Sequence, residues 1–248
     1  MLWMRISEAK TPDLILRLND VVSGYVGEQN ILHGISFDVR NGEVLSIIGP
    51  NGAGKSTLFK TIFGAVRTKE GSIGFDGHEI ANLSSLERLR RGLLYIPQGR
   101  TNFPAMTVRE NLEMGAFTRN DNQVKDDIEE VLALFPRLTR IQSEKAGNLS
   151  GGQQKMMEIA RAVLLKPKLI MADEPSMGLD PQSTSAVFDK LLEINAMGKT
   201  LMIVEQNARK ALSVSNRALV LVMGKKRFEG SANEIAKSQE VKKLYLGG

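Results

Sequence analysis

The stretch GPNGAGKST at residues 49–57 constrains the fold more than any other part of this sequence. It follows the run VLSII at residues 44–48, whose apolar side chains predict a buried strand. It leads into TLFKTIFGAV, where apolar residues recur at helical spacing. A glycine-rich turn between a strand and a helix is the context in which the pattern GxxxxGK[ST] binds phosphate. The sequence therefore predicts an α/β fold built around a phosphate loop.

The residues of this loop suit the phosphates of a nucleotide. Glycines allow backbone angles that let successive N–H groups converge on phosphate oxygens. Lys55 adds a mobile charge for the β- and γ-phosphates, and the Ser56 hydroxyl is placed to ligate Mg²⁺. A turn that only joined a strand to a helix would need neither group. The residues expected to bind a nucleoside triphosphate are Gly49, Pro50, Asn51, Gly52, Ala53, Gly54, Lys55, Ser56 and Thr57.

Composition excludes several other classes of protein. The chain has 248 residues and no cysteine, which excludes disulfides and thiolate–zinc sites. The net charge is +5, and its densest basic cluster, Arg88, Arg90 and Arg91, is interpreted as a solvated helix face, so no nucleic-acid partner is expected. No apolar run approaches the roughly 18 residues of a membrane span. A role at a membrane would therefore require a partner protein.

The order of the patterns predicts two kinds of structure around the loop. Strand patterns at residues 14–22, 31–40 and 71–77 predict a partly antiparallel region near the N-terminus. Residues 100–148 contain helical patterns and no strand. The chain is therefore expected to insert a helical lobe into an α/β core.

A buried strand in KLIMADEP delivers Asp173 and Glu174 to its carboxyl end. Two adjacent carboxylates there are costly unless a cation lies nearby, and Mg²⁺ at the phosphate loop is the obvious candidate. Asp173 is expected to hold the metal. Glu174 is expected to orient or deprotonate the attacking water.

Three further residues are candidates for the same site. Gln98 and Gln206 each follow a short apolar strand, and ligands sit at the carboxyl ends of strands in an open parallel sheet. Tyr25 lies in a turn-rich segment and could stack on a base. The sequence alone leaves open that Gln98 is an ordinary loop glutamine and that Tyr25 covers the edge of a core.

LSGGQ at residues 149–153 precedes a helical pattern. Ser150 is a natural N-cap, and a small-residue turn at a helix N-terminus can bind an anion. The alternative is a helix start with flexible glycines.

Together these motifs resemble the nucleotide-binding subunit of an ABC transporter. LSGGQ after the phosphate loop, followed closely by LIMADEP and SMGLD, is specific for that family. The resemblance implies a RecA-like P-loop NTPase core with an N-terminal antiparallel β subdomain and an inserted helical subdomain. Residues 1–12 would be a tail, and residues 13–248 a single ABC ATPase domain with its helical subdomain at about residues 100–165.

The resemblance also implies partners and roles. Two cassettes would stack head to tail, with each ATP between the phosphate loop of one and LSGGQ of the other. Tyr25 would stack on adenine, Gln98 would couple Mg²⁺ to the membrane partner, and Asp180 would link the two sites. The signature residues expected at the opposite ATP are Ser150, Gly151, Gly152 and Gln153. The catalytic set is Glu174, Gln98, Gln206 and Lys55, and the metal set is Ser56, Gln98 and Asp173.

Subfamily features are similar to those of LivF-type subunits of branched-chain amino-acid importers, namely QGRTNFPAMTVRENLEMGA, VEQNARKAL and the terminal YLGG. This resemblance implies an ATPase on the cytoplasmic face of the cell membrane, with permease subunits and, indirectly, a solute-binding protein. Urea or amide import and lipid or lipopolysaccharide export remain alternatives. A soluble ABC protein without a transport role is a more distant one.

One residue departs from the family pattern. Most ABC cassettes carry a histidine where this chain has Gln206, and its two histidines, His33 and His78, both precede the helical lobe. A glutamine offers an N–H₂ donor that does not titrate. We therefore expect Gln206 to contact the γ-phosphate as a neutral donor.

Overall fold

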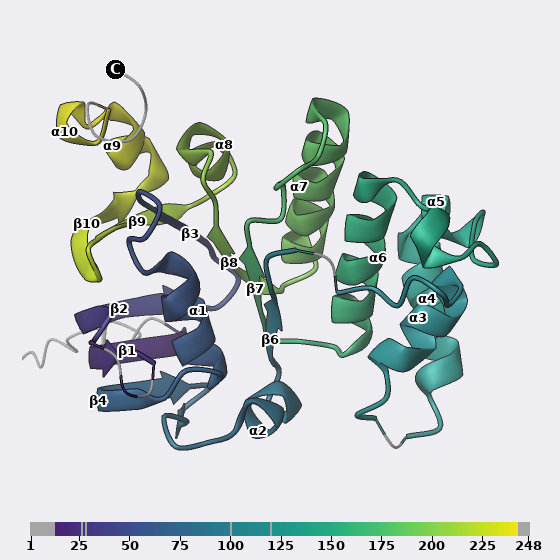
Figure 1. Cartoon of the computed structure of the whole chain (residues 1–248), viewed down its shortest axis with the longest axis horizontal. Coiled ribbons are helices and arrows are strands. Elements are labelled where there is room, and N and C mark those ends of the chain that lie inside the picture. The colour runs from purple at the N-terminus through teal and green to yellow at the C-terminus, as the bar shows by residue number, and fades with distance from the viewer. Residues whose placement is uncertain (1–12, 26, 28, 100, 120, 243–248) are drawn as a thin grey trace, which may run out of the picture.

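The computed structural model describes residues 13–242, apart from residues 26, 28, 100 and 120. The predicted tail at residues 1–12 and the terminal YLGG motif lie outside these residues. Figure 1 shows two sheets at one side of the molecule and a group of helices at the other, joined by α6 and α7. No helix of the described residues is long and apolar enough to cross a membrane.

The first sheet is antiparallel and comes from the N-terminal third of the chain. Its order is β2-β1-β4-β5, and neighbouring strands alternate in direction. The strands are β1 (Leu14–Ser23), β2 (Leu32–Arg40), β4 (Thr68–Phe75) and β5 (His78–Glu79). An Asp76-Gly77 turn joins the last two, with φ angles of 49° and 77°. This sheet is the antiparallel region expected from the sequence.

The second sheet carries the phosphate loop. Its order is β10-β9-β3-β8-β7-β6, parallel except for β10, which runs antiparallel to β9. The strands are β3 (Val44–Ile48), β6 (Leu93–Ile96), β7 (Leu169–Asp173), β8 (Thr200–Val204), β9 (Arg217–Val222) and β10 (Lys225–Ser231). Every residue of β3, β7 and β8 is buried, which agrees with their continuous apolar runs.

Helices cover this sheet and fill the interval between β6 and β7. They are α1 (Lys55–Phe63), α2 (Ser85–Arg90), α3 (Val108–Gly115), α4 (Val124–Leu134), α5 (Pro136–Thr139), α6 (Gly151–Leu164), α7 (Pro181–Ala196), α8 (Ala208–Ser213), α9 (Ala232–Lys237) and α10 (Gln239–Val241), with a 3₁₀ turn at Ala146–Asn148. Side chains at Ser84, Thr107, Ser150 and Ser231 close capping boxes at the starts of α2, α3, α6 and α9. The elements therefore begin where the local sequence predicts.

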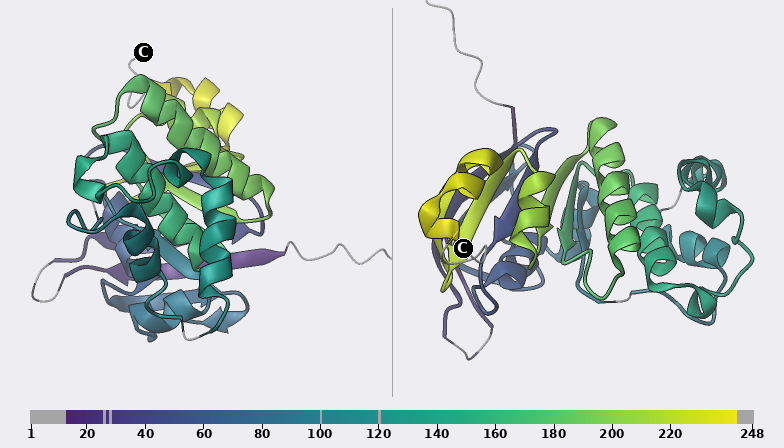
Figure 2. Two further views of the ribbon diagram at one scale, coloured as in Figure 1. Left: turned by 90° about the vertical axis from the view of Figure 1, so that its right-hand side faces the viewer. Right: turned by 90° about the horizontal axis from the view of Figure 1, so that it is seen from above.

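Two large apolar cores lie on opposite faces of the parallel sheet. One joins that sheet to α1 and the antiparallel sheet, and the other joins it to α3, α4, α6 and α7. Figure 2 shows the resulting order from above, with the lobe of α3–α5 beyond α6 and the C-terminal helices at the far end. The predicted fold class, a P-loop α/β core with an antiparallel β region and inserted helices, is confirmed.

The arginine cluster was predicted wrongly. Arg88 is only 1% exposed, and its guanidinium donates to the carbonyls of Thr61 and Ile62 at 2.8 and 2.7 Å. It satisfies carbonyls at the end of α1, a common use of arginine near a helix C-terminus. Burial lowers the pKa of Arg88 to about 10. Only Arg90 and Arg91 are exposed as expected.

The C-terminal hairpin of β9 and β10 has a tight turn that contacts the phosphate loop. Its turn is Met223-Gly224, with φ angles of 48° and 71°. The Gly224 amide donates to the Ala53 carbonyl at 2.9 Å, and the Gly224 carbonyl accepts from His33. A Cβ at Gly224 would lie 1.7 Å from the Ile31 carbonyl, so this position needs glycine. The hairpin thus supports the phosphate loop from the side.

Candidate nucleotide site

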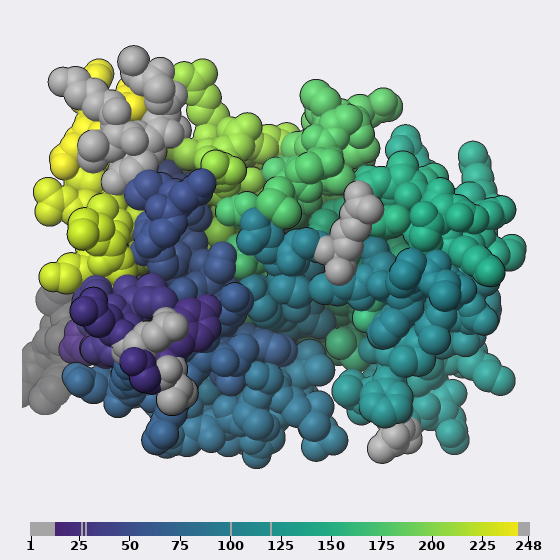
Figure 3. All heavy atoms as spheres, in the orientation of Figure 1, coloured from purple at the N-terminus to yellow at the C-terminus, as the bar shows by residue number. Residues whose placement is uncertain are grey.

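A cavity of about 500 Å³ opens over the phosphate loop, at the carboxyl ends of the parallel strands. The sheet order places β8 next to β3 and β7 next to β8, so segments far apart in sequence meet there. On the face in Figure 3, the blue atoms of the segment that includes the phosphate loop lie left of centre, and the teal helical lobe lies to the right. The lining residues are Ile31, Asn51, Gly52, Ala53, Gly54, Lys55, Ser56, Thr57, Gln98, Glu174, Met177 and Gln206.

The loop backbone needs its glycines for two different reasons. A Cβ at Gly49 would lie 2.1 Å from the Leu221 carbonyl, so β9 leaves no space for a side chain there. Gly52 and Gly54 have φ angles of 76° and 98°, and Gly54 is the N-cap of α1. The N-terminal end of α1 therefore points its unpaired amides at the cavity, as a phosphate-binding helix does.

Lys55 folds back onto its own loop. Its ammonium donates to the carbonyls of Gly49 and Pro50 at 2.9 and 3.0 Å. Burial lowers the pKa of Lys55, and the carboxylates of Glu174 and Asp173 oppose this by favouring the charged form. The lysine is thus held at the cavity with weak carbonyl partners that phosphate oxygens can replace.

Asp173 lies beneath the cavity, 1% exposed, and is held by two hydroxyl groups. Ser56 donates to its Oδ1 at 3.2 Å and Tyr95 donates to its Oδ2 at 2.9 Å. Burial raises the pKa of Asp173, and the hydrogen bonds from Tyr95 and Ser56 lower it. Burial also raises the pKa of Tyr95, which keeps its hydroxyl a donor. Tyr95 was not predicted from the sequence, although it lies three residues before Gln98 on β6.

The Ser56 hydroxyl and the Asp173 carboxylate are suitable ligands for Mg²⁺. No group of three or more His, Cys, Asp or Glu side chains that could hold a metal occurs in the described part of the chain. A hydroxyl paired with one carboxylate is instead the kind of site in which Mg²⁺ keeps several waters and takes its remaining ligands from phosphates. The pairing of Ser56 with Asp173 provides this arrangement.

Glu174 and Gln98 meet as their places on neighbouring strands predict. The Gln98 amide donates from Nε2 to Glu174 Oε2 at 3.0 Å and to the Met177 sulfur at 2.9 Å. Its Oε1 is therefore left to accept from, or ligate, another group. Gln206 lies at the same cavity, beyond the end of β8. Lys55, Gln98, Glu174 and Gln206 are thus brought together.

The remaining predicted residues lie elsewhere. Among the described residues, the cavity lining includes neither Tyr25 nor any residue of 150–153. Ser150 caps α6 in a capping box with Gln153. A Cβ at Gly152 would lie 2.4 Å from the Ser183 hydroxyl, so the signature turn packs against α7.

Asp180 is the N-cap of α7. Its carboxylate accepts from the amides of Gln182 and Ser183, both at 3.0 Å, at the start of α7. Hydrogen bonds from Ser183 lower the pKa of Asp180. Within one chain, Asp180 and the signature turn form a second polar region apart from the cavity.

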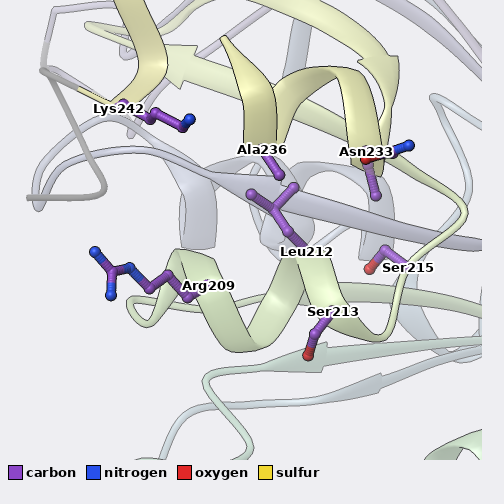
Figure 4. Close-up of a pocket in the computed structure, with 8 residues that line it drawn as sticks. Arg209, Leu212, Ser213, Ser215, Asn233, Ala236 and Lys242 are labelled. Carbon is purple, nitrogen blue, oxygen red and sulfur yellow. The ribbon is translucent and has the colours of Figure 1, made fainter. Parts of the chain in front are cut away.

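Another cavity, of about 560 Å³, lies between α8 and α9 (Figure 4). Leu212 and Ala236 face each other across it, with Arg209 and Lys242 toward one end. None of its described lining residues belongs to the predicted nucleotide set.

Comparison with known proteins agrees with the geometry. The family model described as ABC transporter matches residues 32–177. The chain belongs to the ABC transporter family. This ABC cassette is 40% identical over 229 residues to the high-affinity branched-chain amino acid transport ATP-binding protein BraG of Pseudomonas aeruginosa, covering 92% of this chain and 98% of that protein. It is 37% identical to the probable branched-chain amino acid transport ATP-binding protein LivF of Archaeoglobus fulgidus, covering 94% and 99%.

A solved structure shows the same fold. The ADP form of an ATP-binding cassette of an ABC transporter superposes with a TM-score of 0.86 at 31% identity, covering 95% of this cassette and 99% of that chain. The predicted family, ATP binding and ABC-type ATPase activity are confirmed. The cassette is the ATP-binding subunit of a transporter.

Proposed function

We propose that this cassette powers the import of branched-chain amino acids or closely related solutes across the cell membrane. The observation that carries the proposal is the similarity to BraG and LivF, which extends over almost the full length of all three chains. The residues at the cavity support binding and hydrolysis of ATP. The surface of the helical lobe supports contact with a membrane partner.

Binding of ATP starts at the phosphate loop. Backbone amides of the phosphate loop donate to the phosphates, and Lys55 exchanges the Gly49 and Pro50 carbonyls for β- and γ-phosphate oxygens. Ser56, Asp173 and Gln98 would hold Mg²⁺. The ion would supply positive charge to stabilise the phosphates during hydrolysis.

Hydrolysis then requires a positioned water. Glu174 orients or deprotonates it, and the Gln98 amide donates to the Glu174 carboxylate to hold its direction. Gln206 donates to the γ-phosphate without exchanging a proton. Tyr25, which is 38% exposed, would stack on the adenine ring.

A second cassette completes the site. Head-to-tail pairing would bring Ser150, Gly151, Gly152 and Gln153 of one copy to the γ-phosphate held by the other. The positive end of α6 is suited to that charge, because its first amides and the Ser150 hydroxyl lie at an exposed helix start. Asp180 would lie at the junction between the two ATP sites.

The membrane partner would contact the lobe beside Gln98. Phe103, Met114 and Phe117 are 38%, 38% and 80% exposed, and exposed apolar side chains can mark a protein interaction site when they form a patch. A groove of about 180 Å³ lies next to them, lined in part by Pro97 and Gly115. A cytoplasmic loop of a permease fits this surface, which would hold the cassette at the cytoplasmic face. A solute-binding protein would then act through the permease.

The test is to identify the complex and its solute. We expect the tagged full-length cassette, purified from detergent-solubilised membranes, to carry two permease subunits, and we expect cells lacking it to lose uptake of labelled leucine, isoleucine or valine. Wild-type cassette should restore uptake and Glu174→Gln should not. Normal uptake of all three in the deletion strain, or co-purification with lipid-export subunits, would contradict the proposal.

A further inference from the structure

Glu205 is a buried carboxylate beside the nucleotide cavity that the proposed reaction does not use. It follows β8, immediately precedes Gln206, and is 2% exposed. A buried carboxylate is costly unless hydrogen-bond donors satisfy it. Its partners therefore indicate what it holds in place.

One donor to Glu205 comes from the loop that follows β7. The Ser176 amide donates to Glu205 Oε1 at 3.0 Å. Burial raises the pKa of Glu205, and hydrogen bonds from the Ser176 hydroxyl and amide and from the Asn207 amide lower it. The carboxylate thus ties the 174–177 loop to the segment that carries Gln206.

That loop holds Glu174 in an uncommon backbone conformation. Glu174 has a φ angle of 49°, a left-handed value that non-glycine residues keep only where surrounding contacts impose it. Its amide donates to the Val204 carbonyl at 2.8 Å, and its carbonyl accepts from Met177 at 3.1 Å. Val204 and Glu205 therefore fix the loop at two successive points.

We propose that Glu205 is a positioning residue, which holds the 174–177 loop so that the Glu174 carboxylate stays directed at the attacking water and moves together with Gln206. This inference rests on the proposed role of Glu174. A displacement of about 1 Å at a reacting group can lower a rate a hundredfold. The phosphate loop does not depend on this contact, so ATP affinity should change little.

The test replaces Glu205 in the full-length cassette and measures steady-state ATPase, ATP affinity and thermal midpoint. Glu205→Met keeps the length of the side chain without its acceptors, and we expect kcat to fall about thirtyfold with KM for ATP changed less than about threefold. Glu205→Gln keeps an oxygen for the Ser176 amide and should retain kcat within about threefold. If Glu205→Met does not fold, Glu205→Ala is measured with the same thresholds.

Two comparisons separate positioning from stability. Glu43 is another buried carboxylate, immediately before β3; it pairs with Arg217 at 2.7 Å and does not line the cavity. Glu43→Met should therefore lower the thermal midpoint without the same loss of kcat. In a Glu174→Gln background, Glu205→Met should lower the residual rate less than about twofold, because both act through one group.

The outcomes distinguish two failures. Wild-type kcat in Glu205→Met, or an equal loss in the Glu174→Gln background, overturns the positioning role alone. Wild-type turnover in Glu174→Gln overturns the proposed base, and with it the basis of this inference.

Discussion

The two polar regions of this cassette are built in opposite ways. At the phosphate loop, the segments that follow β3, β6, β7 and β8 line one cavity, and both Lys55 and Asp173 are buried in this part of the fold. At the signature turn, Ser150 and Asp180 are exposed and are occupied in capping the helices that follow them. Figure 1 shows β6, β7 and β8 between α1 and α6.

This difference indicates which half of the site one chain can make alone. Buried charges at the phosphate loop lie in a region of low dielectric, where electrostatic stabilisation is strong. The signature turn offers helix-end amides and small side chains, which bind an anion only when something else supplies and encloses it. A second copy would supply the missing half, and the following changes test that division.

Glu174→Gln should produce the largest loss. Removing the base while keeping the shape of the side chain should lower turnover about a thousandfold and leave ATP binding intact. Steady-state ATPase and equilibrium ATP binding measure the two quantities, and sizing with ATP and Mg²⁺ should show an ATP-bound dimer. The exposed Glu193→Gln serves as the matched control. Turnover near wild type would remove Glu174 from the site.

Lys55→Ala and Ser150→Arg should each lower ATPase about a hundredfold, since each removes one half of the phosphate contacts. Because a head-to-tail dimer has two composite sites, an equal mixture of the two variants should recover about a quarter of wild-type activity. Each variant alone at the same total concentration is the control. A mixture as inactive as its components would refute the division of the site between two chains.

Substitutions of Gln206 should lower ATPase activity less than those of Lys55 or Ser150. Gln206→His keeps a donor to the γ-phosphate, so its ATPase should stay within about tenfold of wild type, roughly one hydrogen bond to a charged group. Gln206→Ala should cost more because the donor is lost. Steady-state ATPase assays of both variants test whether Gln206 donates to the γ-phosphate. An alanine variant as active as wild type would place Gln206 outside the site.

Replacing Arg88 should lower the stability of the fold and hardly change the ATPase rate. Arg88→Ala leaves buried carbonyls at the end of α1 without donors, so the free energy of unfolding should fall by about 3 kcal/mol. Arg90→Ala should change it by less than about 0.5 kcal/mol. Denaturant titration measures both, and equal values would mean that Arg88 is as solvated as its neighbour.

The sequence by itself determined the features that depend on neighbouring residues. GPNGAGKST specified its strand, turn and helix because the glycine conformations and the flanking apolar runs lie within a few residues. Capping boxes such as Ser84 with Glu87 are equally local, because the two residues are three positions apart. Motif order was enough for the family. Gln98, Glu174 and Gln206 each follow an apolar strand and line one cavity, and their roles there stay predictions.

Only the tertiary structure decided the roles of residues whose partners are distant in the chain. Tyr95 reaches Asp173 across 78 residues, Arg88 reaches Thr61 across 27, and Glu205 holds Ser176 across 29. A basic run such as Arg88, Arg90 and Arg91 is typical of a solvated helix face. The sequence pattern does not show that carbonyls at the end of α1 lie within reach of Arg88. Burial depends on how the whole chain packs. In the folded chain Arg88 donates to carbonyls at the end of α1, and Glu205 accepts from the Ser176 amide. Both side chains satisfy polar groups that folding removes from water.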